Sequence, residues 1–404
     1  MKASLEVADL FRAFGPAYRE DHGHEMPVRH KRVMRAIEIC RTAELGGHVD
    51  QCDQCGALRI SYNSCRNRHC PKCQTLDKER WLEAREKDLL PTSYFHTVFT
   101  LPQGVRLLAL RNQKVVYNLL FQSASETLTQ LAKDPKHLGA EIGFIAILHT
   151  WTQTLMDHPH LHCLVPGGGL SSDGKRWMSS RQDFFLPVEV LSALFRGKFL
   201  DGLKKAYEAG QLTFAGQIEG LKEASAFKRF LNDLYDQDWV VYCKPPLRNS
   251  QKLMDYLGRY THRVALSNDR LVKREGSQVT FRWRDSADGN KIKRITLEAF
   301  EFIRRFLLHV LPEQFVKIRY DGILSHRNRK RKLLSCKRLL GVLTAKEPER
   351  VPKETWQDLL TRISGIDPRV CPHCGKGKMI QREILSTCSV SPANRMPPNG
   401  ECPP

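Results

Sequence analysis

The sequence predicts an α+β fold, with a central antiparallel sheet flanked by helices and preceded by a small zinc-binding domain. Short segments rich in β-branched and aromatic residues, such as 94–101, are interspersed with longer segments of helical periodicity. Residues 40–75 are instead dense in Cys, His and Asn, with too few large apolar side chains for an ordinary core. We therefore expect three domains: 1–90 (helical and zinc-binding), 91–345 (the sheet) and 346–404 (a partly disordered tail with a further cysteine motif).

The individual elements are predicted from periodicity and from the positions of Pro and Gly. Pro27 interrupts a helical region over 1–39, and Pro102 ends the strand over 94–101. Gly210 is placed to end a helix over 188–209. Further helices are expected over 76–90, 105–132, 217–236 and 297–308, and further strands over 141–148, 161–166, 176–178, 239–243, 264–267, 271–274 and 279–283. The Pro-, Ser- and Asn-rich chain from 384 onward is expected to be disordered.

The charge balance favours a nucleic-acid partner. The 404 residues include 64 Lys and Arg against 44 Asp and Glu, which gives a net charge of +20. We find no apolar run near the length of a membrane span and no signal-peptide core, so we expect a cytoplasmic protein without a membrane partner. The thiols of a cytoplasmic chain are reduced, and thirteen cysteines therefore indicate metal binding rather than disulfides.

Two Cys-x2-Cys motifs predict a structural Zn²⁺ site. Cys52 and Cys55 are separated from Cys70 and Cys73 by 14 residues, a spacing typical of a closed site with four thiolates. Four further candidate ligands crowd the same stretch and could complete a second zinc site: Cys40, His48, Cys65 and His69. The two histidines could equally be solvated or contact DNA phosphates. A third motif, Cys371-Pro-His-Cys374, cannot close a tetrahedral site alone.

Two clusters of basic residues are candidate DNA contacts. Arg66, Arg68 and Lys72 lie between the cysteines and form a cationic loop that could read DNA. A dense basic run follows Ser325 and is expected to track backbone phosphates. Its candidate residues are Arg327, Arg329, Lys330, Arg331 and Lys332.

The segment His158-Pro-His160-Leu-His162 predicts an open metal site. Side chains alternate along a strand, so His160 and His162 point to one face and could share one divalent ion. Two imidazoles leave positions open for phosphate oxygens and water, which suits catalytic Mg²⁺ or Mn²⁺, the latter better matched to imidazole. His158 is the first candidate for a third ligand, because it shares the same face if the strand extends through Pro159. Other candidates left open are Asp157, Gln153 and His262.

Two tyrosines are candidate nucleophiles. Tyr256 and Tyr260 are one helical turn apart, so both hydroxyls could approach one metal site in turn. Arg259 and Arg263 flank them and could neutralise a phosphate in the transition state. A metal on the scissile phosphate together with a tyrosine is the combination that cleaves one DNA strand through a phosphotyrosine link.

In these histidine, tyrosine and cysteine motifs the chain resembles the HUH rolling-circle transposases of the insertion-sequence 91 type. The resemblance covers most of residues 30–340 and rests on four motifs. They are Leu45-Gly-Gly-His48, Asn63-Ser-Cys-Arg-Asn-Arg-His-Cys-Pro-Lys-Cys-Gln74, His158-Pro-His-Leu-His-Cys-Leu-Val-Pro-Gly-Gly-Gly169 and Tyr256-Leu-Gly-Arg-Tyr-Thr-His-Arg-Val-Ala-Leu-Ser-Asn268.

The resemblance implies a bacterial transposase with an HUH nuclease domain and an N-terminal zinc domain that helps to recognise element ends. Carried over, His160 and His162 are metal ligands, and Tyr256 and Tyr260 are nucleophile candidates, with one or two tyrosines acting. The expected activity is metal-dependent nicking of single-stranded DNA at an element end, followed by strand transfer through a 5′-phosphotyrosine.

Two rival functions stay open, and one motif is set aside. A relaxase or replication initiator would share the same HUH site, whereas a zinc-containing DNA-binding regulator would lack catalysis. Gly169–Lys175 superficially matches a P-loop, but Arg176 follows where Ser or Thr should hold Mg²⁺. We expect a hairpin there. The sequence carries no signal for the oligomeric state.

Overall fold

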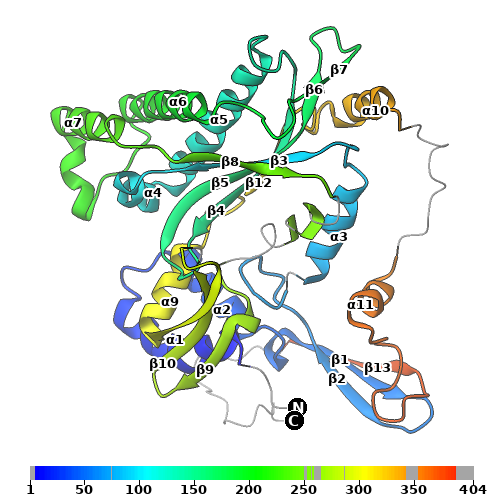
Figure 1. Cartoon of the computed structure of the whole chain (residues 1–404). Helices are drawn as coiled ribbons and strands as arrows, with labels where there is room; N and C mark the ends of the chain where they lie inside the picture. The colour runs from blue at the N-terminus through cyan, green and yellow to red at the C-terminus, as the bar shows by residue number, and fades with distance from the viewer. Residues whose placement is uncertain are drawn as a thin grey trace. The chain divides into compact units, whose positions relative to one another are not determined.

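The computed structural model describes residues 5–73, 75–249, 253–255, 257–258, 265–285, 287–342 and 354–387 (Figure 1). The chain divides into two compact units, and both are discontinuous in sequence. Unit 1 comprises Met1–Arg80, His262–Val310 and Pro348–Pro404, and unit 2 comprises Trp81–Thr261 and Leu311–Glu347. This division differs from the three consecutive domains expected above, because two later segments fold with the N-terminus rather than with the central sheet.

A five-stranded antiparallel sheet forms the centre of unit 2, with strand order β12-β4-β5-β3-β8. Its strands are β3 (Tyr94–Thr100), β4 (Gly143–Trp151), β5 (Asp157–Pro166), β8 (Val241–Leu247) and β12 (Ile318–Gly322). Most residues of β3, β4 and β5 are buried, which agrees with the apolar runs at 144–148 of β4 and 163–165 of β5. The predicted central antiparallel sheet is therefore confirmed.

Helices cover the sheet, and each face has its own apolar cluster. The helical elements of unit 2 are η2 (Gln103–Val105), α4 (Arg106–Arg111), α5 (Gln113–Lys133), α6 (Val188–Glu208), η3 (Gly216–Lys222), α7 (Ala224–Tyr235) and α10 (Arg329–Leu339), while α3 (Thr75–Glu86) begins in unit 1. Helices α4 to α7 gather on one side of the sheet in Figure 1, where Leu161 and Cys163 of β5 belong to the larger cluster. Ile147 and Leu164 belong to the smaller cluster on the opposite face.

A small hairpin completes unit 2. Strands β6 (Gly168–Leu170) and β7 (Trp177–Ser179) pair antiparallel around the segment that resembles a P-loop. The expectation of a hairpin there is confirmed, and no helix follows at the position that phosphate binding would require.

The apolar core of unit 1 combines helices from distant parts of the sequence, since α1 (Val7–His22) contacts both α2 (Val28–Glu38) and α9 (Ala299–Leu308). The other helical elements of unit 1 are η1 (Ala43–Leu45), η4 (Asn268–Arg270) and α11 (Trp356–Ser364). Phe11 of α1 contacts Phe306 of α9 edge to face, with ring centroids 5.3 Å apart. Beside them lies an antiparallel meander of β9 (Leu271–Glu275), β10 (Gln278–Asp285) and β11 (Lys291–Glu298).

A second sheet of unit 1 joins residues more than 300 positions apart. β1 (Gly47–Cys52) and β2 (Leu58–Tyr62) form a hairpin, and β13 (Met379–Leu385) pairs antiparallel with the other edge of β1. Residues up to Leu385 are thus ordered in a strand, whereas disorder was expected from 384. Residues 388–404 lie outside the described part of the chain.

Two other details of the strands differ from prediction. Residues 265–267 are not in a strand, and the third strand of the meander is β11 instead. β8 continues through Pro245 and Pro246 rather than ending before them; it is an edge strand, where a missing N–H is tolerated. Among the described residues, no helix has the length and apolar character needed to cross a membrane.

Candidate metal centres

Three histidines from two neighbouring strands form the candidate catalytic site in unit 2. His160 and His162 lie two residues apart on β5, and His149 of β4 is the cross-strand partner of His160. One ring nitrogen from each of the three histidines lies within 4.8 Å of the others. His149 and His162 are buried and His160 is half-buried. The predicted strand through His160 and His162 is confirmed, and the pair does share one face.

The third histidine differs from the one expected. His158 is exposed and does not belong to the group, although its ring centroid is 5.2 Å from that of His160. His149 is directly across from His160 on the neighbouring strand, and its ring centroid is 4.4 Å from that of His162, whereas His158 is four residues from His162 along β5. The pairing of β4 with β5 therefore brings His149, not His158, to the site. Asp157 points to the opposite face of β5, where the side chains of the larger apolar cluster lie.

Hydrogen bonds orient two of the three rings. Nδ1 of His160 lies 2.7 Å from the carbonyl oxygen of His158, so Nδ1 carries the proton and donates it. Nε2 of His160 is then the nitrogen that could bind an ion. Nδ1 of His162 lies 2.7 Å from Nε2 of His96, a buried residue of β3. His96 thus stands behind His162 as a hydrogen-bonding partner outside the group of three.

The surroundings keep the imidazoles of His96, His160 and His162 neutral. Burial lowers the pKa of His160 to about 4, and burial with the nearby His149 lowers the pKa of His162 well below its ordinary value. Burial and the charge of Lys244 lower the pKa of His96 to about 3. Neutral imidazoles are the form that binds a metal, so the site is prepared for an ion at neutral pH. Lys244 is exposed on β8, directly across from His96.

The tyrosine segment packs on the histidine-bearing face of the sheet. Leu253, Met254 and Leu257 are buried in the same apolar cluster as Ile147 and Leu164, and the backbone N–H of Leu253 donates to the carbonyl of Asn249. Ile147 is on the same face of β4 as His149, and Leu164 is on the same face of β5 as His162. The predicted residues Tyr256, Tyr260, Arg259 and Arg263, and the alternative ligand His262, lie outside the described residues.

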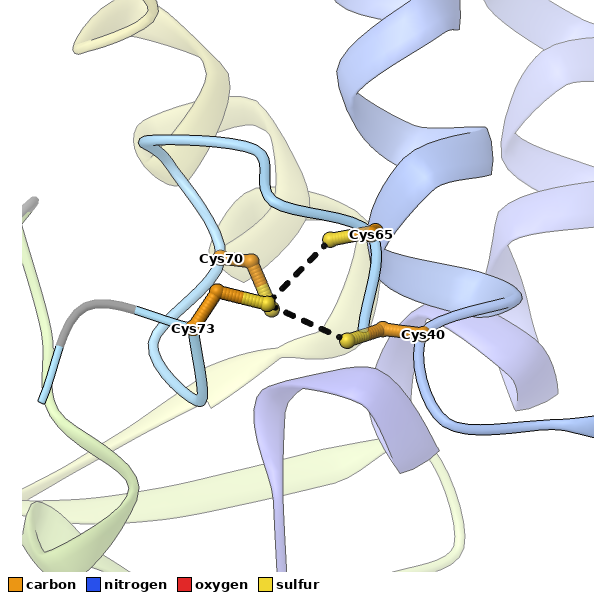
Figure 2. A group of neighbouring side chains, drawn as sticks. All are labelled: Cys40, Cys65, Cys70 and Cys73. Carbon is orange, nitrogen blue, oxygen red and sulfur yellow. Dashed lines mark hydrogen bonds between the residues drawn. The ribbon is translucent and has the colours of Figure 1, made fainter. Parts of the chain in front are cut away.

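Four cysteines in unit 1 form a compact thiol cluster, shown in Figure 2. They are Cys40 after α2, Cys65 after β2, and Cys70 and Cys73 of the following loop. Their sulfur atoms lie within 4.8 Å of one another, with Cys40 and Cys65 at 3.4 and 3.5 Å from Cys73. A tetrahedral zinc site with Zn–S bonds of about 2.3 Å requires sulfur atoms roughly 3.8 Å apart, so the cluster fits such an ion.

This grouping corrects the predicted set of Cys52, Cys55, Cys70 and Cys73. The spacer between the two motifs contains strand β2 and is not a simple loop. Cys52 and Cys55 are at the tip of the β1–β2 hairpin, whereas Cys70 and Cys73 follow its open end, and five residues of strand separate the two ends by roughly 17 Å. Cys52 and Cys55 lie instead beside Cys371 and Cys374.

The two predicted histidine ligands of the zinc domain do not join either cluster. His48 of β1 is 3.5 Å from a carboxylate oxygen of Asp50. His69 is buried, and its backbone N–H donates to the side-chain oxygen of Asn67 at 2.9 Å. Cys40 and Cys65 were expected to combine with these histidines, and they combine with Cys70 and Cys73 instead.

Some of the predicted DNA-binding residues are exposed, and others form ion pairs within the protein. In the zinc loop, Arg66 is exposed and Arg68 is half-buried, while Lys72 forms an ion pair with Glu6 at 2.6 Å. In and before α10, Lys332 contacts both carboxylate oxygens of Glu141 at 2.5 and 2.7 Å, and Arg329 lies 3.6 Å from Asp88. The residues of the basic run that are exposed are Arg327, Lys330 and Arg331.

Sequence reasoning missed His149 and His96. Each is a histidine in a stretch of apolar, aromatic and β-branched residues that forms a buried strand, which was the one available signal. Periodicity identifies the face of each strand, but not which strands are neighbours or in what register. That information was needed to group these residues with His160 and His162.

Comparisons with known proteins identify the family. The family described as "Transposase zinc-binding domain", of the IS91 type, matches residues 10–101, and that described as "Putative transposase" matches residues 143–332. The chain is 52% identical over 392 residues to "Putative transposase y4qJ" of Sinorhizobium fredii, covering 97% of this chain and 98% of the relative. It is 25% identical over 371 residues to the transposase for insertion sequence element IS801 of Pseudomonas savastanoi pv. phaseolicola, covering 88% of this chain and 84% of that protein.

A solved structure of the conjugative relaxase TrwC in complex with oriT DNA also matches, over 40% of this chain and 67% of that one. Its 15% identity and TM-score of 0.21 are too low to carry an argument. The sequence relatives and the two family matches carry the identification, which agrees with the motifs at the zinc loop, the histidines and the tyrosines. The chain belongs to the IS91 family of transposases.

Proposed function

We propose that this transposase nicks one DNA strand at an element end and transfers it through a 5′-phosphotyrosine, in a rolling-circle mode of transposition. One observation carries the proposal: His149, His160 and His162 converge on the sheet face that also buries Leu253 and Leu257. Three imidazole nitrogens and the buried leucines of the segment that carries the tyrosines share one face of one sheet, which supports the proposal.

The histidine site suits a divalent ion such as Mg²⁺ or Mn²⁺, and three imidazoles favour Mn²⁺. Three protein ligands leave coordination positions for substrate, as in catalytic rather than structural sites. When bound, the ion would withdraw charge from the scissile phosphate and orient it for in-line attack. The carbonyl of His158 and the ring of His96 would hold His160 and His162 in the required orientation.

The covalent step would use Tyr256 or Tyr260. The tyrosine oxygen loses its proton and forms a bond to phosphorus, and the bond from phosphorus to the 3′ oxygen breaks. The 3′ oxygen leaves and gains a proton, so the DNA 5′ end stays attached to the protein. A 3′ hydroxyl of the target strand can reverse the step, so no nucleotide cofactor is required.

The remaining sites would hold the DNA. Zn²⁺ bound by Cys40, Cys65, Cys70 and Cys73 would fix the loop that carries Arg66 and Arg68 against the N-terminal helices. The exposed Arg327, Lys330 and Arg331 would contact backbone phosphates. Lys244 is exposed beside the histidines and is a further candidate for neutralising phosphate charge.

The proposal is tested by capturing the covalent intermediate. The purified protein is incubated with labelled single-stranded DNA spanning the end of its element, with Mg²⁺ or Mn²⁺, and run on a denaturing gel. We expect a labelled band of protein size in the wild type and in the control Tyr235→Phe, an exposed tyrosine of α7. EDTA and the double variant Tyr256→Phe/Tyr260→Phe should abolish the band, and the single variants show whether one or both tyrosines act.

Two results would contradict the mechanism. Nicking by the double tyrosine variant would exclude both tyrosines as nucleophiles, and a metal-dependent nick without an adduct would indicate a hydrolytic nuclease. Addition of a second, unlabelled target strand then distinguishes transposition from relaxase-type rejoining, because only a transposase should join the captured end to unrelated DNA.

A further inference from the structure

We infer that Cys52, Cys55, Cys371 and Cys374 form a second, closed Zn²⁺ site, which fastens the C-terminal segment to the N-terminal hairpin. The four sulfur atoms lie within 4.8 Å of one another, and the pairs Cys52–Cys374 and Cys55–Cys371 are each 3.7 Å apart. That distance is close to the roughly 3.8 Å required by tetrahedral Zn–S geometry. The zinc-domain match ends at residue 101 and so includes only half of this ligand set.

The two halves of the site repeat one local structure. Cys52-Asp-Gln-Cys55-Gly56 and Cys371-Pro-His-Cys374-Gly375 share the pattern Cys-x2-Cys-Gly. In each half the glycine N–H donates to the carbonyl of the first cysteine, at 3.1 Å for Gly56 and 2.9 Å for Gly375. Both glycines have a positive φ, +71° and +68°, which a residue with a side chain adopts only with strain. The turn that ends each half therefore requires glycine.

Backbone N–H groups point at the sulfur atoms of both halves. Those of Gln54 and Cys55 lie 3.4 and 3.5 Å from Sγ of Cys52, and that of His373 lies 3.4 Å from Sγ of Cys371. The N–H of Gly377 lies 3.3 Å from Sγ of Cys374. Donors aimed at sulfur favour the thiolate, the form that binds zinc.

The surrounding backbone holds the two halves together. The N–H of Asp53 donates to the carbonyl of Lys378 at 3.1 Å, and the N–H of Lys378 donates to the carboxylate of Asp53 at 2.8 Å. A Cβ on Gly377 would lie 2.2 Å from Sγ of Cys52, so only glycine permits this close approach. The cluster is thus a packed junction between segments more than 300 residues apart in sequence.

A metal is needed here because the local sheet has little core of its own. In the sheet β13-β1-β2, Leu58, Ile60 and Ile384 are 68%, 55% and 76% exposed. Apolar burial therefore contributes little to holding β13 against β1, and an ion bound by four thiolates can supply that stability. Four cysteine ligands leave no position for substrate, so the site is structural.

The test is a count of zinc ions per chain in the reduced, full-length protein, by mercurial release of zinc into a chromogenic chelator. We expect two ions in the wild type and in the control Cys243→Ser, which changes a cysteine outside both clusters. Cys52→Ser/Cys55→Ser and Cys371→Ser/Cys374→Ser should each retain one ion. The variant with all four substitutions should also retain one, because both pairs serve the same ion.

Other counts would overturn the inference. If the Cys371→Ser/Cys374→Ser variant keeps the wild-type count, the C-terminal cysteines bind no zinc. If the four-fold variant loses one ion more than either pair variant, the two halves bind separate ions. A wild type with one ion and four fewer titratable thiols before reduction would mean two disulfides instead.

A conservative variant controls for loss of zinc that is caused only by misfolding. Cys374→His replaces one zinc ligand by another, so the count should stay at two. In the Co²⁺-substituted protein, the sulfur-to-cobalt absorption should fall by about one part in eight, since one of eight thiolates is lost. The count is made without DNA, so its failure would leave the proposed cleavage chemistry untouched.

Discussion

The histidine site of unit 2 and the cysteine clusters of unit 1 use metal ligands in opposite ways. The histidines lie on adjacent strands of a sheet that has large apolar clusters on both faces. The cysteines lie in loops at the two ends of a hairpin with little core around it. Where a core already holds the backbone, an ion is not needed for folding and can keep open positions for chemistry. Where the core is absent, the ion itself must hold the fold.

The largest effect that we expect, and the one that tests this contrast most directly, is on folding. Cys40→Ser should abolish zinc binding at the cluster of Figure 2 and strongly lower the thermal stability of unit 1, because structural zinc contributes on the order of 10 kcal/mol to folding. Loss of the divalent ion from the histidine site, in the variant His160→Ala, should leave the fold intact. Circular dichroism melts of the two preparations, with zinc counts on each, measure the difference. Equal melting would contradict the division into structural and catalytic sites.

The next effect concerns the identity of the third histidine. His149→Ala should lower metal-dependent nicking by more than about 100-fold, because it removes a metal ligand itself and not a residue that hydrogen-bonds to a ligand. His158→Ala is the matched control on the same sheet face: its backbone carbonyl, which accepts from His160, is unchanged. Initial rates over a titration of Mn²⁺ provide the measurement. A larger loss in His158→Ala than in His149→Ala would restore the ligand set expected from sequence.

A smaller effect on metal affinity is expected from substitution of His96, which hydrogen-bonds to His162. His96→Leu removes the hydrogen bond at 2.7 Å and should weaken the apparent affinity for Mn²⁺ by about 10- to 100-fold. His96→Gln, which can keep a hydrogen bond, should recover much of the loss. The rate at saturating Mn²⁺ should change less than the affinity. If His96→Leu instead lowers only that saturating rate, His96 does not act through metal binding.

The smallest effect sharpens the contrast between the two faces of β5. Asp157 is buried on the face opposite the histidines, and burial raises the pKa of its carboxyl to about 7. The folded state thus holds a proton between about pH 4 and 7 that the unfolded state lacks, so stability falls as pH rises through that window. Asp157→Asn does not titrate, and should be stabilising by roughly 1 kcal/mol at pH 8 but not at pH 4. Urea melts at both pH values test this, and a gain that is equal at both would contradict the assignment.

Local patterns in the sequence predicted much of the fold and part of the site. Alternation and apolar runs predicted the strands carrying His96 and His160 and the neighbouring strand up to Leu148, one residue short of His149, and Pro27 and Gly210 marked helix ends. The tyrosine motif and the zinc loop identified the family, later confirmed by the relatives. The pattern Cys-x2-Cys-Gly, which occurs at Cys52 and Cys371 but not at Cys70, was a further signal in the sequence that could have paired the two knuckles.

The sequence by itself determined which residue types could bind metal and on which strand face they lie, because periodicity is a property of neighbouring residues. Only the tertiary structure decided which of them meet. The strand order places His149 beside His160. The β1–β2 hairpin separates Cys52 from Cys70, and the pairing of β13 with β1 brings Cys371 to Cys52. Contacts between distant segments depend on strand register and on the burial of whole faces, and spacing along the chain does not encode either.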